Sequence, residues 1–236
     1  VGVAPKRDLR VGHSQNRSMV FGPFGVGTKR TVWQLPRLGE QTLQRRNGLK
    51  ILLLGSSGQV GWELRRSLAP LGEVLSLNRD SSEACGDLAQ PHALVDGLQK
   101  YRPDVVVNAA AYTAVDQAEK DADMAHLVNA SAPAALARAC QELGALLVHY
   151  STDYVFDGTG EAPWTESSVP APLNVYGLTK WAGEQAIVAS GCDHLIFRTS
   201  WVYAARGGNF AKTMLRLAKE RETLRVIDDQ FGAPTG

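Results

Sequence analysis

The chain has 236 residues, and its 44% hydrophobic and 21% charged content is ordinary for a soluble globular protein. Charge is unevenly spread: residues 1–49 hold nine Lys and Arg against two acids, whereas residues 50–236 hold 16 against 22. The mildly acidic globular part therefore has no electrostatic footprint for nucleic acid. No run of about 18 apolar residues predicts a membrane span.

The three cysteines, Cys85, Cys140 and Cys192, are widely separated and form no C-x-x-C pair. This usage predicts free thiols in a reducing compartment, and we expect the cytosol. The N-terminus also lacks the short apolar block of a signal peptide.

Residues 1–48 are rich in Gly, Arg, Ser and Gln and carry no sustained period. Three accounts compete: a disordered tail or mis-set translation start, an Arg-rich transit peptide, and a basic nucleic-acid arm. We favour the first, because the segment cannot bury enough apolar surface to offset its ordering. We expect a disordered or non-native basic extension over 1–48 and a globular domain over 49–236.

From Lys50 onward, short apolar strands alternate with helices. The expected strands are 50–55, 73–77, 104–108, 145–151 and 194–200, and the expected helices are 58–69, 90–100, 125–144, 175–189 and one that begins near Phe210. Such alternation indicates right-handed βαβ units. The sequence therefore predicts an α/β fold, a doubly wound parallel sheet of the Rossmann type.

Gly55, Gly58 and Gly61 form G-x-x-G-x-x-G between the first strand and its helix. The first glycine permits a tight turn, the second lets backbone N–H groups approach a pyrophosphate, and the third lets helix and strand pack closely. The helix N-terminus adds partial positive charge. The pattern indicates a dinucleotide site, for which a plain glycine-rich turn is the alternative.

The second strand ends in SLNRD, where an acid that reads the adenosine ribose would favour NAD. Asn78 is neutral and Arg79 is cationic, which favours a 2′-phosphate and hence NADPH over NADH; Arg79 as a solvated surface charge is the alternative. Asp87 could accept from the adenine amino group while Leu88 covers the ring. Asp87 could equally be an acid at a helix N-terminus.

Several candidates fall at or just beyond the carboxyl ends of successive strands, where open α/β sheets bind ligands. They are Gly55, Asn78, Ala111, Thr152 and Trp201. The small side chains of NAAA (108–111), including Ala110, would let a flat ligand lie against the backbone. Cys192, Asp193 and His194 are adjacent but lack a metal-ligand spacing, so we predict no metal site from them.

Tyr176 and Lys180 are four residues apart on an expected helix, so they share a face about 6 Å apart along the axis. We expect the Lys180 ammonium to lower the Tyr176 pKa toward working pH. Tyr176 would then protonate a carbonyl oxygen that the Thr152 hydroxyl also binds, as a reduced nicotinamide delivers hydride to the carbonyl carbon. A half-buried Tyr and a solvated Lys on an amphipathic helix are the alternative.

These blocks resemble the extended short-chain dehydrogenase/reductase family and, within it, the dTDP-4-dehydrorhamnose reductases. The resemblance runs from about Lys50 to Gly236 through LLLGSSGQVG, VVNAAAYTAVDQAE, VNASAPAALA, STDYVFDG, PAPLNVYGLTKWAGE, RTSWVY and DDQFGAPTG. It implies NAD(P)H-dependent reduction of the 4-keto group of dTDP-4-dehydro-6-deoxy-L-mannose to dTDP-L-rhamnose, for cell-surface polysaccharide.

The resemblance also implies roles for individual residues. Tyr176 would be the proton donor, Lys180 its partner and ribose ligand, and Thr152 the hydrogen-bond donor to the carbonyl. Asp153 and Trp201 would contact the sugar. The cofactor would be surrounded by Gly58, Gln59, Val60, Asp87, Leu88, Ala111, Tyr112 and Thr113. Related dehydratases carry a second acid where Tyr154 stands, so water elimination is not expected.

Two departures from the family pattern bear on these expectations. Many members have an acid at the Asn78 position, so the cofactor preference does not carry over. Members also continue for some tens of residues beyond GAPTG, so we expect a truncated substrate region here. Glu63 matches a position at which some members bind Mg²⁺ across a homodimer interface, although a surface glutamate is the plainer reading.

Three hypotheses therefore compete. The first is the reductase or another sugar-nucleotide reductase or epimerase. The second is a non-catalytic NADP-binding subunit that resembles the β subunit of methionine adenosyltransferase, which carries serine where this chain has Thr152. The third is a fragment or redundant copy that binds cofactor only.

Overall fold

A computed structural model of the chain describes residues 17–20, 48–226, 230 and 232–236. Its centre is a parallel sheet of six strands: β1 (Arg17–Val20), β2 (Leu49–Leu54), β3 (Gly72–Leu77), β4 (Val105–Asn108), β5 (Leu146–Thr152) and β6 (His194–Thr199). Their order across the sheet is β1-β6-β5-β4-β2-β3. The predicted doubly wound parallel sheet is confirmed, with strand bounds within two residues of those expected.

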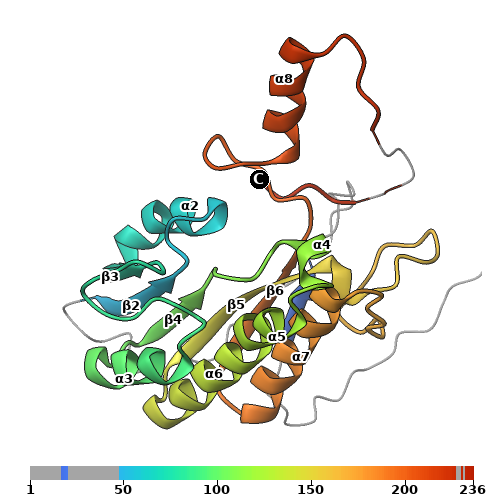
Figure 1. The fold of residues 1–236 in the computed structure, drawn as a ribbon. Helices are drawn as coiled ribbons and strands as arrows, with labels where there is room; N and C mark the ends of the chain where they lie inside the picture. The colour runs from blue at the N-terminus through green and yellow to red at the C-terminus, as the bar shows by residue number, and fades with distance from the viewer. Residues whose placement is uncertain (1–16, 21–47, 227–229, 231) are drawn as a thin grey trace, which may run out of the picture.

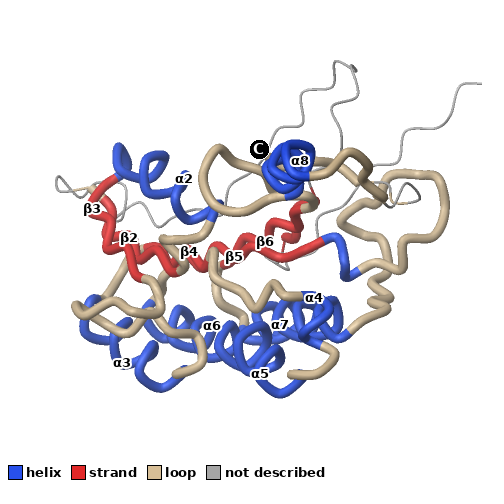
Figure 2. The backbone as a smooth tube through the Cα atoms, turned by 45° about the horizontal axis from the view of Figure 1, so that its top comes forward, coloured by secondary structure: helices blue, strands red, loops and turns tan. Residues whose placement is uncertain are grey.

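Helices cover both faces of this sheet (Figures 1 and 2). On one side lies α2 (Gln59–Leu68), followed by a short 3₁₀ turn, η1 (Ala69–Leu71). The other side carries α3 (Pro91–Tyr101), α4 (Val115–Ala118), α5 (Ala122–His126), α6 (Ala132–Leu143) and α7 (Val175–Ser190). Among the described residues, no helix has the length and apolar character needed to cross a bilayer.

The central strands place apolar side chains on both faces of the sheet, so helices must cover both faces. Leu52, Leu54 and Val106 pack into the larger apolar cluster with α3, α6 and α7, while Ile51 and Leu53 face the cluster beneath α2. Successive side chains of a strand point to opposite faces, so a strand buried on both sides is apolar throughout. This is why the central strands appear in the sequence as unbroken runs of Leu, Ile and Val.

The helix expected over residues 125–144 is present, but it is not α-helical throughout. Between α5 and α6 lies a π-helical turn, η2 (Leu127–Ser131). Within it, the Asn129 side chain bonds the backbone of Tyr112 at both ends, since Oδ1 accepts from its N–H (2.9 Å) and Nδ2 donates to its carbonyl (3.1 Å). A π turn widens the helix at functional sites in other proteins, and here it lets one side chain hold the loop that follows β4.

Two segments lie at the margins of this sheet. Four residues of the predicted N-terminal extension form β1, parallel to β6, which the sequence did not indicate; the remainder of 1–47 lies outside the described residues, so the extension stays a prediction. At the other end, α8 (Phe210–Glu220) has no buried residue and stands apart from the sheet (Figure 1).

The strand order reverses beside β2, because β3 pairs on one side of it and β4 on the other. The connections after β2 and β4 therefore leave in opposite directions and open a crevice at the carboxyl edge of the sheet. In open α/β sheets this switch point is where ligands bind, and it is where the sequence-predicted residues gather.

Candidate active site

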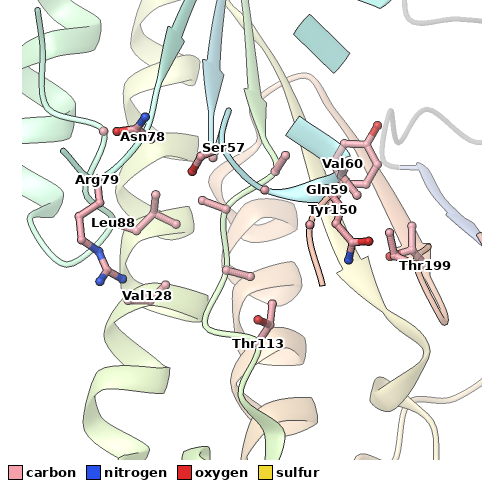
Figure 3. A pocket seen from close by; sticks show the side chains of 18 of the residues that line it. Ser57, Gln59, Val60, Asn78, Arg79, Leu88, Thr113, Val128, Tyr150 and Thr199 are labelled. Carbon is pink, nitrogen blue, oxygen red and sulfur yellow. The ribbon is translucent and has the colours of Figure 1, made fainter. Parts of the chain in front are cut away.

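A pocket of about 710 Å³ opens at this crevice, within the size range of small-molecule sites. Figure 3 shows Asn78, Arg79 and Leu88 at one end and Tyr150 and Thr199 at the other. Most residues proposed for the cofactor line it: Gly55, Gly58, Gln59, Val60, Asn78, Arg79, Asp87, Leu88, Ala110, Ala111, Thr113, Tyr176 and Lys180. Residues from five strand ends thus share one cavity.

The glycine loop has the backbone shape that its spacing indicates. Gly55 has a φ of +79°, and a Cβ there would lie 2.7 Å from the Ala110 nitrogen. A Cβ on Gly61 would collide with the carbonyl oxygen of Gly55. At Gly58, which caps α2, the only backbone atom near a Cβ is the Gly55 oxygen at 3.4 Å. The loop is therefore closed toward the protein and open toward the pocket.

At the other end of the pocket, hydrogen bonds fix the loop after β3. Asn78 Oδ1 accepts from the Asp80 N–H (2.9 Å), and the Asn78 N–H donates to Ser81 Oγ (2.9 Å). Arg79 remains 80% exposed, its Nε 3.9 Å from Asp87 Oδ1. The Asp87 carboxylate also accepts from the Ala89 N–H (3.0 Å). Arg79 is thus a solvated cation at the rim, held near an acid.

Tyr176 lies in the first turn of α7. Asn174 caps this helix by accepting from the Gly177 N–H at 2.8 Å, and Gly177 lies so close to the Tyr154 carbonyl that a Cβ would not fit. The Tyr154 ring meets the Tyr176 ring edge-on, with centroids 5.5 Å apart. The cap, the glycine and the ring contact together fix the position of the phenol.

Burial raises the pKa of Tyr176 to about 12, whereas a hydrogen bond with the Thr152 hydroxyl opposes this rise and the neighbouring Asp153 adds to it. The expectation that Lys180 lowers this pKa is wrong for this structure. The reason is where Lys180 Nζ is bound: it donates to the Tyr150 carbonyl at 2.6 Å and lies 3.2 Å from His149 Nε2. The nitrogen is held by β5 rather than by the phenol.

Lys180 itself is only 1% exposed. Burial lowers its pKa to about 8, while the charge of Glu184 one turn along α7 opposes that shift. Glu184 in turn forms a buried ion pair with Arg198 of β6, at 2.5 Å between Oε2 and a terminal guanidinium nitrogen. The helix face that begins with Tyr176 therefore continues inward as a line of ionisable groups.

The three residues proposed for the sugar adjoin one another at the ends of β5 and β6. Thr152 Oγ1 donates to Asp153 Oδ1 (3.2 Å), and Ser200 Oγ donates to Asp153 Oδ2 (2.6 Å). Trp201 follows at once, 49% exposed and with a φ of +45°, which is uncommon for a residue with a side chain. The structure brings Thr152 and Asp153 together beside Tyr176, while Trp201 follows Ser200 at the end of β6. None of the three lines the cofactor-sized pocket.

Two predicted cofactor residues lie elsewhere. Gly61 packs against the glycine loop from behind, and the Tyr112 hydroxyl donates to Asp121 Oδ2 (3.3 Å), away from the pocket. Ala109, within the 108–111 stretch expected to face a flat ligand, lines the pocket. Sequence reasoning missed these lining residues: Ser57, Asp80, Gly86, Val128, Tyr150, Ser151, Thr199, Val202, Gly207 and Gly208. Ser57, Val128, Ser151, Thr199 and Val202 fall inside the quoted motifs, so their spacing could have indicated them.

No cluster of three or more His, Cys, Asp or Glu that could hold a metal occurs in the described part of the chain. Glu63, the position compared with a Mg²⁺ ligand, is an exposed partner of Arg66 on α2. His194 is buried, with Nδ1 2.8 Å from the Cys192 carbonyl oxygen. A magnesium site at Glu63 stays a prediction.

Comparison with known proteins places this geometry in a family. The model of the RmlD substrate binding domain matches residues 49–236. The chain belongs to this family. It is 60% identical over 188 residues to the dTDP-4-dehydrorhamnose reductase of Salmonella typhimurium and 58% identical to that of Escherichia coli K12. In each case the match covers 80% of this chain and 63% of the relative, so the chain spans somewhat less than two thirds of their length.

Solved structures agree with this assignment. The dTDP-4-dehydrorhamnose reductase of Bacillus anthracis, determined in complex with NADP, aligns at a TM-score of 0.75 and 39% identity over 80% of this chain and 66% of that one. The orthologue from Clostridium acetobutylicum aligns at 0.74, also at 39% identity, over 79% and 65%. The fold inferred from the strand pattern is thus the fold of these reductases.

Proposed function

We propose that this chain carries the catalytic half of an NAD(P)H-dependent reductase that converts the 4-keto group of dTDP-4-dehydro-6-deoxy-L-mannose to the alcohol of dTDP-L-rhamnose. One observation gives this proposal its main support. A glycine-loop pocket, the Tyr176 phenol and the Thr152 hydroxyl converge at the carboxyl edge of one sheet in a chain of the RmlD family. The non-catalytic and cofactor-only hypotheses lack a reason for the Tyr176–Thr152 contact.

The pocket fits a dinucleotide on its own geometry. The Gly55–Gly61 loop leaves its backbone open to the cavity at the N-terminus of α2, which suits a pyrophosphate. Ala110 and Ala111 give the opposite wall no bulky side chains. Asn78, Arg79, Asp87 and Leu88 would hold the adenosine, and Tyr176 and Lys180 the nicotinamide ribose. When bound, the reduced nicotinamide supplies hydride to the carbonyl carbon.

Tyr176 would act as the acid in the direction of reduction. A phenol whose pKa is about 12 stays protonated at neutral pH, so it has a proton to give to the developing alkoxide. Thr152 would share that oxygen as a second hydrogen-bond donor and stabilise its growing charge. Lys180, whose nitrogen is held by β5, would serve as a ligand of the nicotinamide ribose rather than as the partner of the phenolate.

The sugar would lie over the ends of β5 and β6. Asp153, fixed by Ser200, presents a carboxylate that can accept from sugar hydroxyls, and the exposed Trp201 ring offers a flat apolar face. Tyr154 has a packing role, since its ring contacts Tyr176 and its N–H donates to Thr152 Oγ1 at 3.2 Å. With no second acid beside Asp153, the arrangement favours reduction over water elimination.

Arg79 favours NADPH over NADH, because an exposed cation at the adenosine end can pair with a 2′-phosphate. The reaction would take place in the cytosol, consistent with the three free thiols. A homodimer and bound Mg²⁺ stay predictions from the family resemblance.

The test is turnover by the full-length natural protein. We expect loss of the NADPH absorbance when the 4-keto sugar nucleotide is added. Tyr176→Phe should lower the rate by roughly 10²- to 10⁴-fold while leaving NADPH affinity nearly intact. Tyr101→Phe is the matched control and should keep full activity, because Tyr101 is a half-buried tyrosine at the end of α3 that bonds Glu73 and does not line the pocket.

Each alternative outcome has a distinct meaning. NADPH binding without turnover in the wild-type protein would favour the non-catalytic subunit. Unchanged turnover in Tyr176→Phe would remove the assigned proton donor. A lower Michaelis constant for NADH than for NADPH would defeat the Arg79 argument.

A further inference from the structure

Behind the pocket, three buried polar side chains form a chain from β4 to α7. Asn108 and His149 are neighbours across β4 and β5, with Asn108 Nδ2 3.1 Å from His149 Nδ1. His149 Nε2 lies 3.2 Å from Lys180 Nζ. All three side chains are at most 1% exposed. The proposed mechanism assigns nothing to Asn108 or His149, although they connect a pocket wall to the lysine.

The donor and acceptor roles along this row of hydrogen bonds follow from Asn108. Its Oδ1 accepts from the N–H of Ala110 at 3.1 Å, and Ala110 lines the pocket. Turning the amide over would set an NH₂ group against that N–H, so two donors would meet. Asn108 Nδ2 therefore faces His149 as a donor, and His149 Nδ1 must accept.

The histidine tautomer is then determined. Burial, followed by the charge of Lys180, lowers the pKa of His149 well below its usual value, so the ring is neutral and carries one proton. With Nδ1 accepting, that proton is on Nε2 and points at Lys180 Nζ. An ammonium has three donors and no acceptor, whereas a neutral amine has a lone pair. The Nε2–H of His149 therefore has an acceptor only when Lys180 is a neutral amine, which accepts from His149 and donates to the Tyr150 carbonyl.

Other ionisable groups surround Lys180, and none reverses this conclusion. On α7 they are Tyr176, which stays neutral, and Glu184, whose charge is paired with Arg198 of β6. On β5 they are His149 and Tyr150, both neutral because burial disfavours their charged forms. The Glu184 carboxylate favours the ammonium, but its attraction is shared with the guanidinium.

We propose that Asn108 and His149 are positioning residues that couple the charge of Lys180 to the hydrogen bond of the pocket-lining Ala110 N–H. When Lys180 takes up a proton from solvent, Nε2 must become the acceptor. His149 then loses the proton on Nε2 and gains one on Nδ1, so the ring still carries one proton. The Asn108 amide must turn to accept from Nδ1–H, and this frees the Ala110 N–H.

This inference deepens the proposed function and rests on it for the role of Lys180, because the charge of that lysine decides which hydrogen bonds it can offer the nicotinamide ribose. The tautomer itself is a property of the folded chain without any ligand. It is therefore open to a measurement that needs no turnover.

The test is a pH titration of the full chain, with ¹⁵N-labelled histidine and ¹³C-labelled lysine, followed by NMR. The chain has five histidines, and the His149→Gln spectrum identifies the signals of His149. We expect the Nε2–H tautomer above the Lys180 midpoint near pH 8 and the Nδ1–H tautomer below it, with one proton on the ring throughout. A tautomer that does not change across the lysine titration, or a doubly protonated ring, would overturn the proposal.

Asn108→Asp sharpens the test because it keeps the shape and removes the donor. One carboxylate oxygen can still accept from Ala110, while the other requires a proton on His149 Nδ1. We expect the Nδ1–H tautomer at every pH, and a Lys180 midpoint raised by about one pH unit or more, since an ammonium can now donate to Nε2. Gln141→Glu, an exposed position on α6, adds the same charge and should change neither signal.

Failure of this inference is distinguishable from failure of the proposed function. If the coupled titration is seen but the 4-keto sugar is not reduced, the positioning role stands and the reaction is wrong. If reduction occurs while the tautomer stays fixed, the reaction stands and the coupling is wrong. Should Asn108→Asp not fold, the wild-type titration still decides.

Discussion

The face of α7 toward β5 and β6 and the exposed helix α8 both carry charged and apolar side chains, yet they are held in opposite ways. Lys180 and Glu184 are buried, and each has a defined partner on a neighbouring strand, the Tyr150 carbonyl of β5 and the Arg198 guanidinium of β6. On α8, by contrast, Phe210 is 64% and Leu215 is 68% exposed, and the Arg216–Glu220 pair is open to solvent.

The inward face of α7, which carries the proposed chemistry, is held firmly, whereas α8 is loosely attached. Among the described residues, two side-chain contacts connect the α8 region to α2: Asn209 Nδ2 donates to Gln59 Oε1 at 3.0 Å, and the Arg206 guanidinium lies 3.5 Å from the centre of the Trp62 ring. Both contacts lead to α2, next to the glycine loop. We therefore expect substitutions on α7 to change folding stability strongly and those on α8 to act locally.

Glu184→Gln should have the largest effect on stability. It leaves the Arg198 charge buried without a counter-ion, which typically costs about 3–5 kcal/mol of unfolding free energy. Urea unfolding measures it. The matched control on α8 is Glu220→Gln, which breaks an exposed i,i+4 pair and should cost at most about 0.5 kcal/mol. Equal losses from the two substitutions would contradict the comparison.

The double variant Glu184→Leu with Arg198→Met separates pairing from packing. Replacing both charges with apolar groups removes the uncompensated ion, so most of the lost stability should return. A double variant as unstable as Glu184→Gln would show that shape rather than charge pairing holds this position.

Lys180→Met should remove a pH dependence. The pKa of Lys180 is about 8 when folded against 10.5 otherwise, so the unfolded chain binds more protons between those values and stability rises with pH. This one group contributes a slope of at most about 1.4 kcal/mol per pH unit, and its destabilising effect is complete below pH 8. The unfolding free energy of the wild type should therefore rise relative to that of the variant from pH 8 to 10; parallel curves would contradict the shifted pKa.

Asn209→Ala should have an intermediate and local effect. The Asn209 side chain caps α8 by accepting from the Lys212 N–H at 3.0 Å, and loss of such a cap costs about 1 kcal/mol. Hydrogen exchange should speed up in the first turn of α8 and not in α7. Asn174→Ala, the equivalent cap of α7, is the comparison, and there the loss should appear in global unfolding.

Phe210→Ser should have the smallest effect. Its ring is mostly exposed in the described structure, and such surface substitutions usually change stability by less than about 0.5 kcal/mol. Thermal unfolding measures it. A loss of more than about 2 kcal/mol would show that the ring is buried in the protein in solution.

Local sequence pattern was enough for the central strands, the glycine loop and the placement of Tyr176 one turn before Lys180. Each depends on spacing along one segment: the alternating faces of β2, the small residues at Gly55 and Gly61, or the four-residue period of α7. The family resemblance added the likeness to sugar-nucleotide reductases, which a spacing rule does not contain.

What the sequence could not give depends on register between distant segments. The pairing of Asn108 with His149 follows from how β4 and β5 align, and this alignment also brings the Tyr150 carbonyl to Lys180. Those contacts explain why the lysine does not lower the Tyr176 pKa, contrary to the simple i,i+4 argument. Likewise, Gly207 and Gly208 reach the pocket only because the loop before α8 folds back over α2.

Isotope transfer tests the central claim most directly. The full-length natural protein would be given NADPH carrying deuterium at the transferable position of nicotinamide C4, together with the 4-keto sugar nucleotide. The account predicts one deuterium at sugar C4 of the product with wild-type protein, and almost none formed in the same time with Tyr176→Phe. A product without deuterium at that carbon, or equal formation by the variant, would contradict it.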